Sequence, residues 1–376
     1  MSSRRKHFTK YYYKNCRLTA LFHYYLCCHF SGRMEIKMKK IKIVQIGVGH
    51  DHALPTWISL LKQSDLFDVV GWCPVADEAE RPIDQRYFQK PRMTLDEVFA
   101  VPDLDAVAIE TDDWNLTEYA QAAAEHGLAI QMDKPGSASQ EDFEKLARTV
   151  KAKGGVLHLG YMYRYNPMIK SVIAAAKVGE YGDICSVETH MDCEHPVQKR
   201  QWLAHFKGGM LYYLGCHLID LIVQINGIPE KIIPLSYSSG YDGVTSEDVG
   251  MAVFQYPNCV SFAKTSGVES GGFLRRQMVI TGKKRSVEIR PMEEIVSGSL
   301  QITRMRDCVA GRSWNDEGVH SATKPTDRYD GMLAQFAAIA RGEIDNSYSL
   351  EYECQLHRVI LAACGYEIDY KTPVVL

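Results

Sequence analysis

Strand-like and helix-like stretches alternate along residues 41–160, and this alternation constrains the fold more than any other feature. Apolar runs typical of buried strands occur at 41–46, 67–72, 106–109, 128–132 and 156–159. Helical patterns separate them; one opens with the capping sequence Thr94-Leu-Asp-Glu97, and another runs from about Ser139 to Lys153. Parallel strands joined by helices need helices on both faces of the sheet. The pattern therefore predicts a doubly wound α/β domain over residues 39–160.

The rhythm changes after Asn166-Pro167, which is itself a helix start. Six strand-like stretches with short Gly, Pro and Asn turns follow, at 184–190, 232–239, 249–254, 260–265, 278–281 and 286–289. Helices are expected at 210–225, 330–341 and 350–364. Short turns favour antiparallel pairing. Residues 161–376 are therefore expected to form an α+β domain on an open, mainly antiparallel sheet.

Charge is unevenly distributed. Residues 1–40 contain ten Lys or Arg and one acid, whereas residues 41–376 contain 33 Lys or Arg and 45 Asp or Glu. An acidic body has no electrostatic affinity for nucleic acid or anionic membranes. No apolar run is long enough for a transmembrane helix. The eleven cysteines include no CxxC pair and indicate reduced thiols in a cytoplasmic protein.

The basic segment 1–38 shows no usable period. It is expected to be disordered or an upstream reading-frame extension that is absent from the native protein. Nucleic-acid binding by this basic, aromatic arm is the weaker alternative.

A glycine-rich turn, Gly47-Val-Gly49-His50-Asp51-His52, joins the first strand to the first helix. Its glycines allow a tight turn, and a helix N-terminus attracts the pyrophosphate of a dinucleotide. The sequence therefore predicts a Rossmann-type cofactor site at Gly47, Gly49, His50, Asp51 and His52. The sixth position of the motif is His52, where Gly or Ala is usual.

The residue that reads the cofactor ribose is expected at the end of the second strand. Cys73-Pro74 stands there, with Asp77 and Glu78 slightly later and no arginine before Arg81. NAD is therefore favoured as the cofactor, and NADP stays open.

Four motifs in order carry a family resemblance. They are GVGHDHA (47–53), Asp133-Lys134-Pro135, GYMYRYNP (160–167), and Gly208-Gly209 through GCHLIDL (215–221). With them the chain resembles the glucose–fructose oxidoreductase, inositol dehydrogenase and MocA (Gfo/Idh/MocA) family. The resemblance implies a Rossmann domain followed by an α+β domain that binds substrate and mediates homo-oligomers, dimers or tetramers.

The resemblance makes Lys134 the foremost catalytic candidate. It implies that this lysine, in a motif that is usually Glu-Lys-Pro, contacts both nicotinamide ribose and substrate, and that Thr111 and Asp133 contact the cofactor. A cation there orients a hydroxyl and stabilises a developing alkoxide. Burial and a neighbouring nicotinamide cation are expected to lower its pKa enough for proton transfer.

A second catalytic cluster is expected on the 210–225 helix, where Tyr213, His217, Asp220 and Gln224 share one stripe. A solvated helix face would show the same pattern. The resemblance implies that His217 is the proton acceptor, with Tyr213 and Asp220 assisting. Tyr213 stands where these dehydrogenases usually have Asp, and a phenol is a poor base.

Substrate contacts are expected from Tyr161, Tyr163 and Arg164, which follow the last strand of the first domain. Trp202, His205 and Asp192 are further candidates. The run from His190 to His195 contains metal-ligand types, but His195 points to the opposite face of the strand from His190 and Asp192. No metal is therefore expected.

These features predict an NAD(P)-dependent oxidoreductase that acts on a small carbohydrate or cyclitol hydroxyl. One alternative is an enzyme that cleaves glycosides through transient oxidation, without net redox change. The other is a nucleotide-binding regulator that has lost catalysis.

Overall fold

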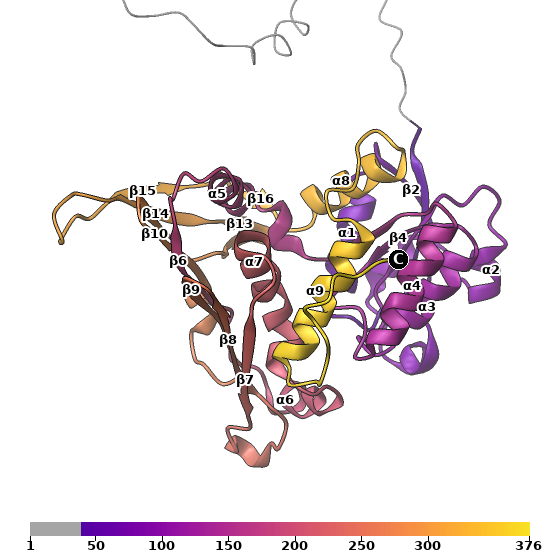
Figure 1. Ribbon diagram of the computed structural model, residues 1–376. Coiled ribbons are helices and arrows are strands. Elements are labelled where there is room, and N and C mark those ends of the chain that lie inside the picture. Colours follow the sequence, from indigo (N-terminus) through magenta and orange to yellow (C-terminus); the bar gives the residue numbers. More distant parts are fainter. Residues whose placement is uncertain (1–38) are drawn as a thin grey trace, which may run out of the picture. The chain divides into compact units, whose positions relative to one another are not determined.

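The first half of the fold is a five-stranded parallel sheet. The protein is described from a computed structural model over residues 39–376, and the expectations for residues 1–38 lie outside the described residues. The strand order is β2-β1-β3-β4-β5 (Figure 1). The strands are β1 (Ile41–Ile46), β2 (Phe67–Cys73), β3 (Ala106–Ile109), β4 (Ala129–Met132) and β5 (Leu157–Leu159). The predicted doubly wound sheet is confirmed.

Both faces of this sheet are buried, as a parallel sheet requires. Alternate side chains of β1 belong to different cores: Ile41 and Ile43 face one side, and Val44 and Ile46 the other. The second side is covered by α3 (Leu116–Glu125) and α4 (Gln140–Ala152), and the first by α1 (Ala53–Lys62). The short helix α2 (Leu95–Phe99) begins with the predicted Thr94–Glu97 capping box.

The last two helices of the chain pack on this first half. Helix α8 (Asp330–Ala340) joins the core beneath α1, where Asp330 accepts a hydrogen bond from Ser59 at 2.7 Å. Helix α9 (Leu350–Ala363) lies against α4, with Arg358 paired to Glu144 at 2.6 Å. The two halves of residues 39–376 are therefore tied together by the end of the chain.

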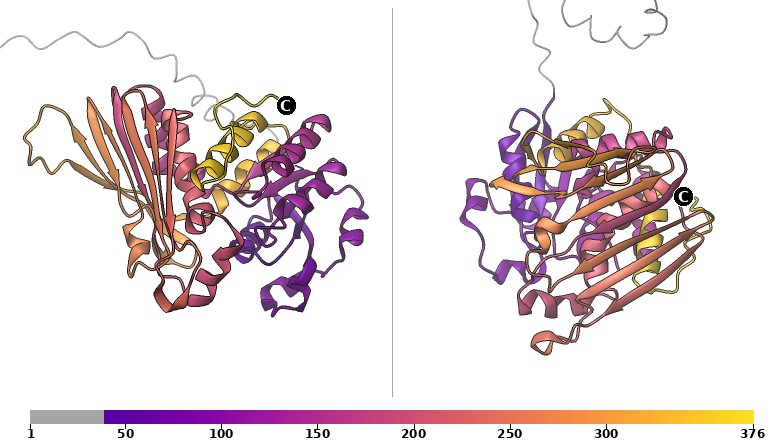
Figure 2. Two further views of the ribbon diagram at one scale, coloured as in Figure 1. Left: turned by 60° about the horizontal axis from the view of Figure 1, so that its bottom comes forward. Right: turned by 90° about the vertical axis from the view of Figure 1, so that its left-hand side faces the viewer.

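The second half is built on an eight-stranded sheet in the order β15-β14-β11-β10-β6-β9-β8-β7. Its strands are β6 (Ile184–His190), β7 (Lys231–Tyr237), β8 (Val249–Tyr256), β9 (Cys259–Ser266), β10 (Gln277–Gly282), β11 (Arg285–Ile289), β14 (Arg304–Val309) and β15 (Val319–Ala322). Only β6 and β9 pair in parallel. The predicted open, mainly antiparallel sheet is confirmed. Figure 2 shows its outer face free of helices from the described residues.

Helices α5 (Pro167–Lys177), α6 (Val197–Trp202) and α7 (Cys216–Asn226) belong to this half. Asn166 caps α5 as predicted, accepting hydrogen bonds from the amides of Met168 and Ile169. The helix expected at 210–225 begins differently, because residues Leu211–Gly215 form a π-helical turn before α7. Within residues 39–376, no helix is long and apolar enough to cross a bilayer.

Five strands after residue 290 escaped the sequence prediction. Besides β14 and β15 they are β12 (Glu294–Ser297), β13 (Leu300–Ile302) and β16 (Thr326–Asp327), which form a separate three-stranded sheet. These strands are short and largely exposed, so they carry little of the apolar alternation that identifies a strand.

Candidate active site

Lys134 is the buried cation of the candidate site. It follows β4 at the carboxyl edge of the parallel sheet, and its side chain is fully buried. Its Nζ donates to the backbone carbonyl of Tyr213 at 3.0 Å and lies 4.8 Å from the centre of that ring. Because Tyr213 belongs to the π-helical turn before α7, this contact joins the edge of the first sheet to the second half of the fold.

The surroundings of Lys134 keep it charged. Burial by itself would lower its pKa, but the groups around it, above all Cys216, Asp133 and Asp113, raise the pKa above its ordinary value. The expected lowering of this pKa by burial and a neighbouring nicotinamide cation stays a prediction, because the raised value belongs to the protein without its cofactor. Lys134 is suited to electrostatic stabilisation rather than to accepting a proton.

His217 is the buried base candidate. It lies in the first turn of α7, with ring centres of Tyr161, Tyr163 and His52 at 5.8, 5.6 and 6.3 Å. Neither ring nitrogen has a hydrogen-bond partner among residues 39–376. Burial, and then the charge of Lys134, hold its pKa well below the ordinary value. The ring is therefore a neutral imidazole with a free acceptor, as proton transfer from a hydroxyl requires.

Tyr213 is held by a charged pair. Its hydroxyl donates to Asp51 of the glycine loop, and Lys199 Nζ lies 2.8 Å from the same carboxylate. Although burial favours the acid form, Lys199 and Tyr213 keep the pKa of Asp51 well below its ordinary value. Lys199 also lies 3.6 Å from the Trp202 ring centre, and Trp202 packs edge-on against Tyr213. Asp51 therefore contacts the second half of the fold in this structure.

The glycine loop is built to hold an anion. Gly47 has φ +93°, and a Cβ there would lie 2.4 Å from the backbone nitrogen of Thr111. The amides of Val48 and Gly49 both donate to the Glu78 carboxylate at 3.0 Å. Glu78 also accepts from two further amides, those of Val75 and Asp112. The carboxylate shows that these amides converge on one negatively charged group.

A pocket of about 530 Å³ lies at the end of β2. Its lining includes Cys73, Pro74, Arg92 and Tyr119. The position at which a ribose-reading residue was expected therefore opens onto space for a ligand.

Arg164 and Asp220 lie in an internal ion cluster. The Arg164 guanidinium donates to Asp220 at 2.8 and 3.0 Å and also binds Glu353 of α9. Its guanidinium carbon lies over the rings of Tyr161 and Tyr348, at 4.3 and 3.8 Å from their centres. The structure therefore does not bring these two side chains into contact with Lys134; they fasten α7 to α9.

Two other substrate candidates are also paired internally. The Tyr163 hydroxyl donates to Glu293, which pairs with Arg276 and Arg328 at 3.1 Å each. Asp192 is fully buried, 3.1 Å from Lys264 Nζ and 3.6 Å from His190. His205 stacks on Trp114 near Trp202, with ring centres 4.5 Å apart.

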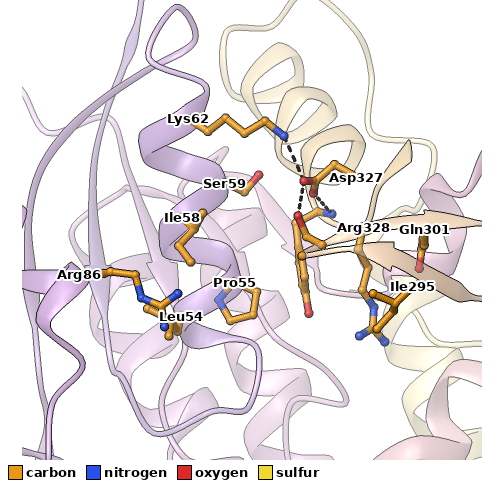
Figure 3. A pocket seen from close by; sticks show the side chains of 13 residues that line it. Leu54, Pro55, Ile58, Ser59, Lys62, Arg86, Ile295, Gln301, Asp327 and Arg328 are labelled. Carbon is orange, nitrogen blue, oxygen red and sulfur yellow. Dashed lines mark hydrogen bonds and ion pairs between the residues drawn. The ribbon is translucent and has the colours of Figure 1, made fainter. Parts of the chain in front are cut away.

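A cavity of about 420 Å³ lies between α1 and residues 295–329 (Figure 3). Leu54, Pro55 and Ile58 form its apolar side, and Lys62 reaches across to Asp327 at 3.0 Å. Tyr329 lines the cavity and lies 5.7 Å from His52, measured between ring centres. This cavity therefore adjoins the site on the α1 side, whereas Lys134 and His217 do not line it.

Several polar residues of this region were not predicted from the sequence. Glu78 binds the glycine loop, whereas its position favoured only a contact with the ribose. The others are Glu110, Glu293, Arg328 and Tyr329. The acidic stretch Glu110–Asp113 directly after β3 was the available signal, because ligands gather at the carboxyl ends of parallel strands.

Each half of the fold matches the model of a known protein family. Residues 41–161 match the model of an oxidoreductase family with an NAD-binding Rossmann fold, and residues 169–288 match the GFO/IDH/MocA C-terminal domain. The resemblance drawn from the four motifs is confirmed.

Curated relatives match over part of their length. The uncharacterized oxidoreductase YhhX of Escherichia coli is 27% identical over 193 residues, which cover 51% of this chain and 54% of YhhX. The scyllo-inositol 2-dehydrogenase (NADP(+)) IolW of Bacillus subtilis is 25% identical over 140 residues, 37% of this chain and 39% of IolW. The chain thus spans about half or less of the length of these relatives.

A solved structure has a similar fold over nearly the whole chain. The WlbA dehydrogenase of Bordetella pertussis, crystallised with NADH and UDP-GlcNAcA, has a TM-score of 0.70 at 18% identity. The match covers 90% of this chain and 100% of that chain. At this identity the likeness shows the fold alone.

Glu78 is expected to stabilise the glycine loop. In Glu78→Ala four amides lose a charged acceptor, so the free energy of unfolding should fall by about 2–4 kcal/mol. Urea denaturation measures this change. The control is Glu80→Ala in the same short helix, where the exposed side chain should contribute less than about 0.5 kcal/mol. Equal stability of the two variants would contradict the assigned role.

Arg164 is expected to act in folding. Arg164→Met leaves the buried carboxylates of Asp220 and Glu353 without a cation, which should cost about 3–5 kcal/mol of unfolding free energy. The control is Arg148→Met, which removes an exposed cation whose partner, Glu144, keeps its pair with Arg358, and which should cost less than about 0.5 kcal/mol. Thermal and urea unfolding distinguish a role in stability from a role in substrate binding. Unchanged stability together with weakened substrate binding would support the substrate contact that the sequence predicts for Arg164.

Proposed function

Because the chain belongs to the Gfo/Idh/MocA oxidoreductase family, we propose that it transfers hydride between a sugar or cyclitol hydroxyl and a nicotinamide cofactor. The observation that carries the proposal is a buried, charged Lys134 close enough to lower the pKa of a buried His217, whose ring nitrogens have no hydrogen-bond partner among residues 39–376. Hydride loss from a carbinol needs both a stabiliser of the forming alkoxide and a proton acceptor. Lys134 fills the first role and His217 the second.

The cofactor proposed is NAD. The amides of Val48 and Gly49 already converge on a carboxylate, and a dinucleotide needs such donors at this loop. Thr111 and Asp133 border the same edge of the sheet, and the pocket beside Cys73 and Pro74 would receive the adenosine end. Cys73 and Pro74, at the position that reads the ribose, carry no charge that would bind a 2′-phosphate, so NAD is proposed before NADP. When bound, the dinucleotide supplies the hydride acceptor.

The remaining residues position these two groups. The Tyr213 carbonyl fixes the Lys134 ammonium, and the Asp51–Lys199 pair fixes the Tyr213 ring. Lys134 keeps its charge because carboxylates surround it, so it would orient the substrate oxygen while His217 takes the proton. Tyr213 stays a phenol, since burial and Asp51 raise its pKa well above the ordinary value. Its proposed role is positioning.

A carbohydrate or cyclitol substrate suits the aromatic and polar walls of the site. The rings of Tyr161 and Tyr163 lie edge-on to His217, at 5.8 and 5.6 Å between ring centres, and aromatic rings beside a reacting carbon pack against the C–H surfaces of a sugar. The relative named as a scyllo-inositol 2-dehydrogenase supports this class.

We also propose a homo-oligomer that covers the outer face of the eight-stranded sheet. Ile233, Leu235 and Tyr237 of β7 point to this face and are 36–59% exposed. Val260 of β9 is 51% exposed on the same side, where Val260 pairs with Gln255 and Ile233 with Val253. An apolar surface of this kind marks an interaction site.

The first experiment is a fluorescence titration with NADH and, separately, NADPH, followed by a screen of sugars and cyclitols with the preferred cofactor. Micromolar binding of NADH and reduction of NAD by one substrate class are expected. Failure of both cofactors to bind folded protein would overturn the proposed function.

Lys134→Met tests the central assignment. The substitution keeps the length of the side chain and removes its charge, so kcat/KM should fall about 100- to 1,000-fold while the Kd for NADH changes only a few-fold. The control is Lys170→Met, which removes an exposed cation on α5. Circular dichroism checks that both variants fold. Unchanged turnover in Lys134→Met would exclude the proposed role of Lys134.

The interface is tested by Leu235→Lys combined with Val260→Lys. Two charges on the outer face should shift the mass measured by light scattering to that of one chain. Val178→Lys, which replaces an exposed apolar residue after α5, should leave the oligomer intact. A monomeric wild-type protein would contradict the proposal directly.

A further inference from the structure

Two histidines and one aspartate converge beneath the glycine loop. His50 and His52 lie at the start of α1, and Asp133 follows β4. Their Nδ1 atoms lie 3.1 and 2.9 Å from the same Oδ2 of Asp133. One ligand-type atom from each residue falls within 4.8 Å of the others. Neighbouring atoms in a tetrahedral zinc shell, with bonds near 2.0–2.2 Å, are about 3.3 Å apart.

A carboxylate without partners lies beside the cluster. Glu110 is fully buried, and neither carboxylate oxygen has a hydrogen-bond partner in the described part of the chain. One of these oxygens lies 3.9 Å from His50 Nδ1. With Asp113 and Asp133, three buried carboxylates surround the two imidazoles, and the buried Lys134 ammonium follows Asp133. Buried carboxylates are costly unless a cation or a hydrogen-bond donor compensates them.

The second nitrogen of His50 is also placed as in a metal site. His50 Nε2 lies 3.6 Å from Asp113 Oδ1, and neither atom has a hydrogen-bond partner within residues 39–376. A histidine that binds a metal through one nitrogen commonly directs the other to a carboxylate, which sets its tautomer. His50 thus has a ligand position on one side and an orienting carboxylate on the other.

We propose that His50, His52 and Asp133 bind one divalent transition-metal ion, Zn²⁺ by their ligand types, with Glu110 beside it. Two imidazoles and a carboxylate are a set that zinc accepts. Three protein ligands leave one position open, as in catalytic rather than structural zinc sites. The ion would lie next to Lys134, which follows Asp133, and near His217. This site accounts for His52, whose place in the glycine motif is otherwise unusual, and it revises the expectation that no metal is bound.

The competing arrangement satisfies the cluster with protons. In it the Nδ1–H of His52 donates to Asp133 at 2.9 Å, and the lone pair of His50 Nδ1 accepts a hydrogen bond from the backbone amide of His52 at 3.1 Å. The two arrangements differ in whether the protein retains a metal, so metal content distinguishes them without any activity measurement.

The test uses the full chain, purified without an affinity metal, stripped with EDTA and then dialysed against Zn²⁺ or Co²⁺. About one Zn²⁺ per chain should be retained, and Co²⁺ should give the intense visible bands of a four-coordinate site. His52→Gln and Asp133→Asn should each weaken Zn²⁺ binding at least 10- to 100-fold, since loss of an orienting partner alone has that effect. The control is His320→Gln, which removes an exposed histidine.

The Co²⁺ spectrum needs no variant, so it decides the question even if a substitution prevents folding. Wild-type protein that binds neither ion stoichiometrically would overturn the proposal, as would His52→Gln and Asp133→Asn variants that bind Zn²⁺ like the wild type. Either result would mean that hydrogen bonds, without a metal ion, satisfy His50, His52 and Asp133. Because cofactor titration is measured separately, failure here leaves the proposed hydride transfer standing.

Discussion

The buried ammonium of Lys134 is the constraint around which the site is arranged. A desolvated cation needs oxygen acceptors and negative neighbours, and the fold supplies them from both halves: the Tyr213 carbonyl from the turn before α7, and Asp133 from the edge of the first sheet. The same contact brings α7 against that edge, so His217, one turn later on this segment, is placed there as well. Burial, and after it the charge of Lys134, keeps the His217 imidazole neutral. The requirement of Lys134 for acceptors thus places both members of the candidate pair and adds to the effect of burial on His217.

Much of the fold follows from local sequence because its signals are local. Buried strands such as β1 and β3 are apolar runs, and Asn166 and the Thr94–Glu97 box begin helices through hydrogen bonds within three residues. The strands β12–β16 have neither long apolar alternation nor buried faces, so their pairing depends on partners distant in sequence. The docking of α8 on α1 is likewise decided by surfaces more than 250 residues apart.

The candidate site divides in the same way. Lys134 could be proposed because it follows a strand at an edge where ligands gather, and His217 because it matches a motif of the family. Asp220 lies on the same face of the predicted helix as His217, but helical spacing does not show which groups that face contacts. In the structure Asp220 pairs with Arg164, which also binds Glu353. Glu78 and Glu110 act through amides and histidines from other loops. No spacing rule connects such residues, because only the folded sheet edge brings them together.

Glu78 occupies the glycine-loop amides in this structure, and this lowers the affinity of the loop for a dinucleotide. In this structure the Val48 and Gly49 amides are satisfied by Glu78, so a dinucleotide gains their hydrogen bonds only by replacing a carboxylate that already makes them. The replacement also leaves Glu78 to find new partners, and its raised pKa, caused mainly by burial, shows that this carboxylate is held at some cost in desolvation. Apparent cofactor affinity then equals the intrinsic affinity reduced by the fraction of chains whose loop is free. The cofactor affinity of this protein is therefore lower than that of a protein with a free loop. The difference depends on how strongly the Glu78 carboxylate binds the loop amides.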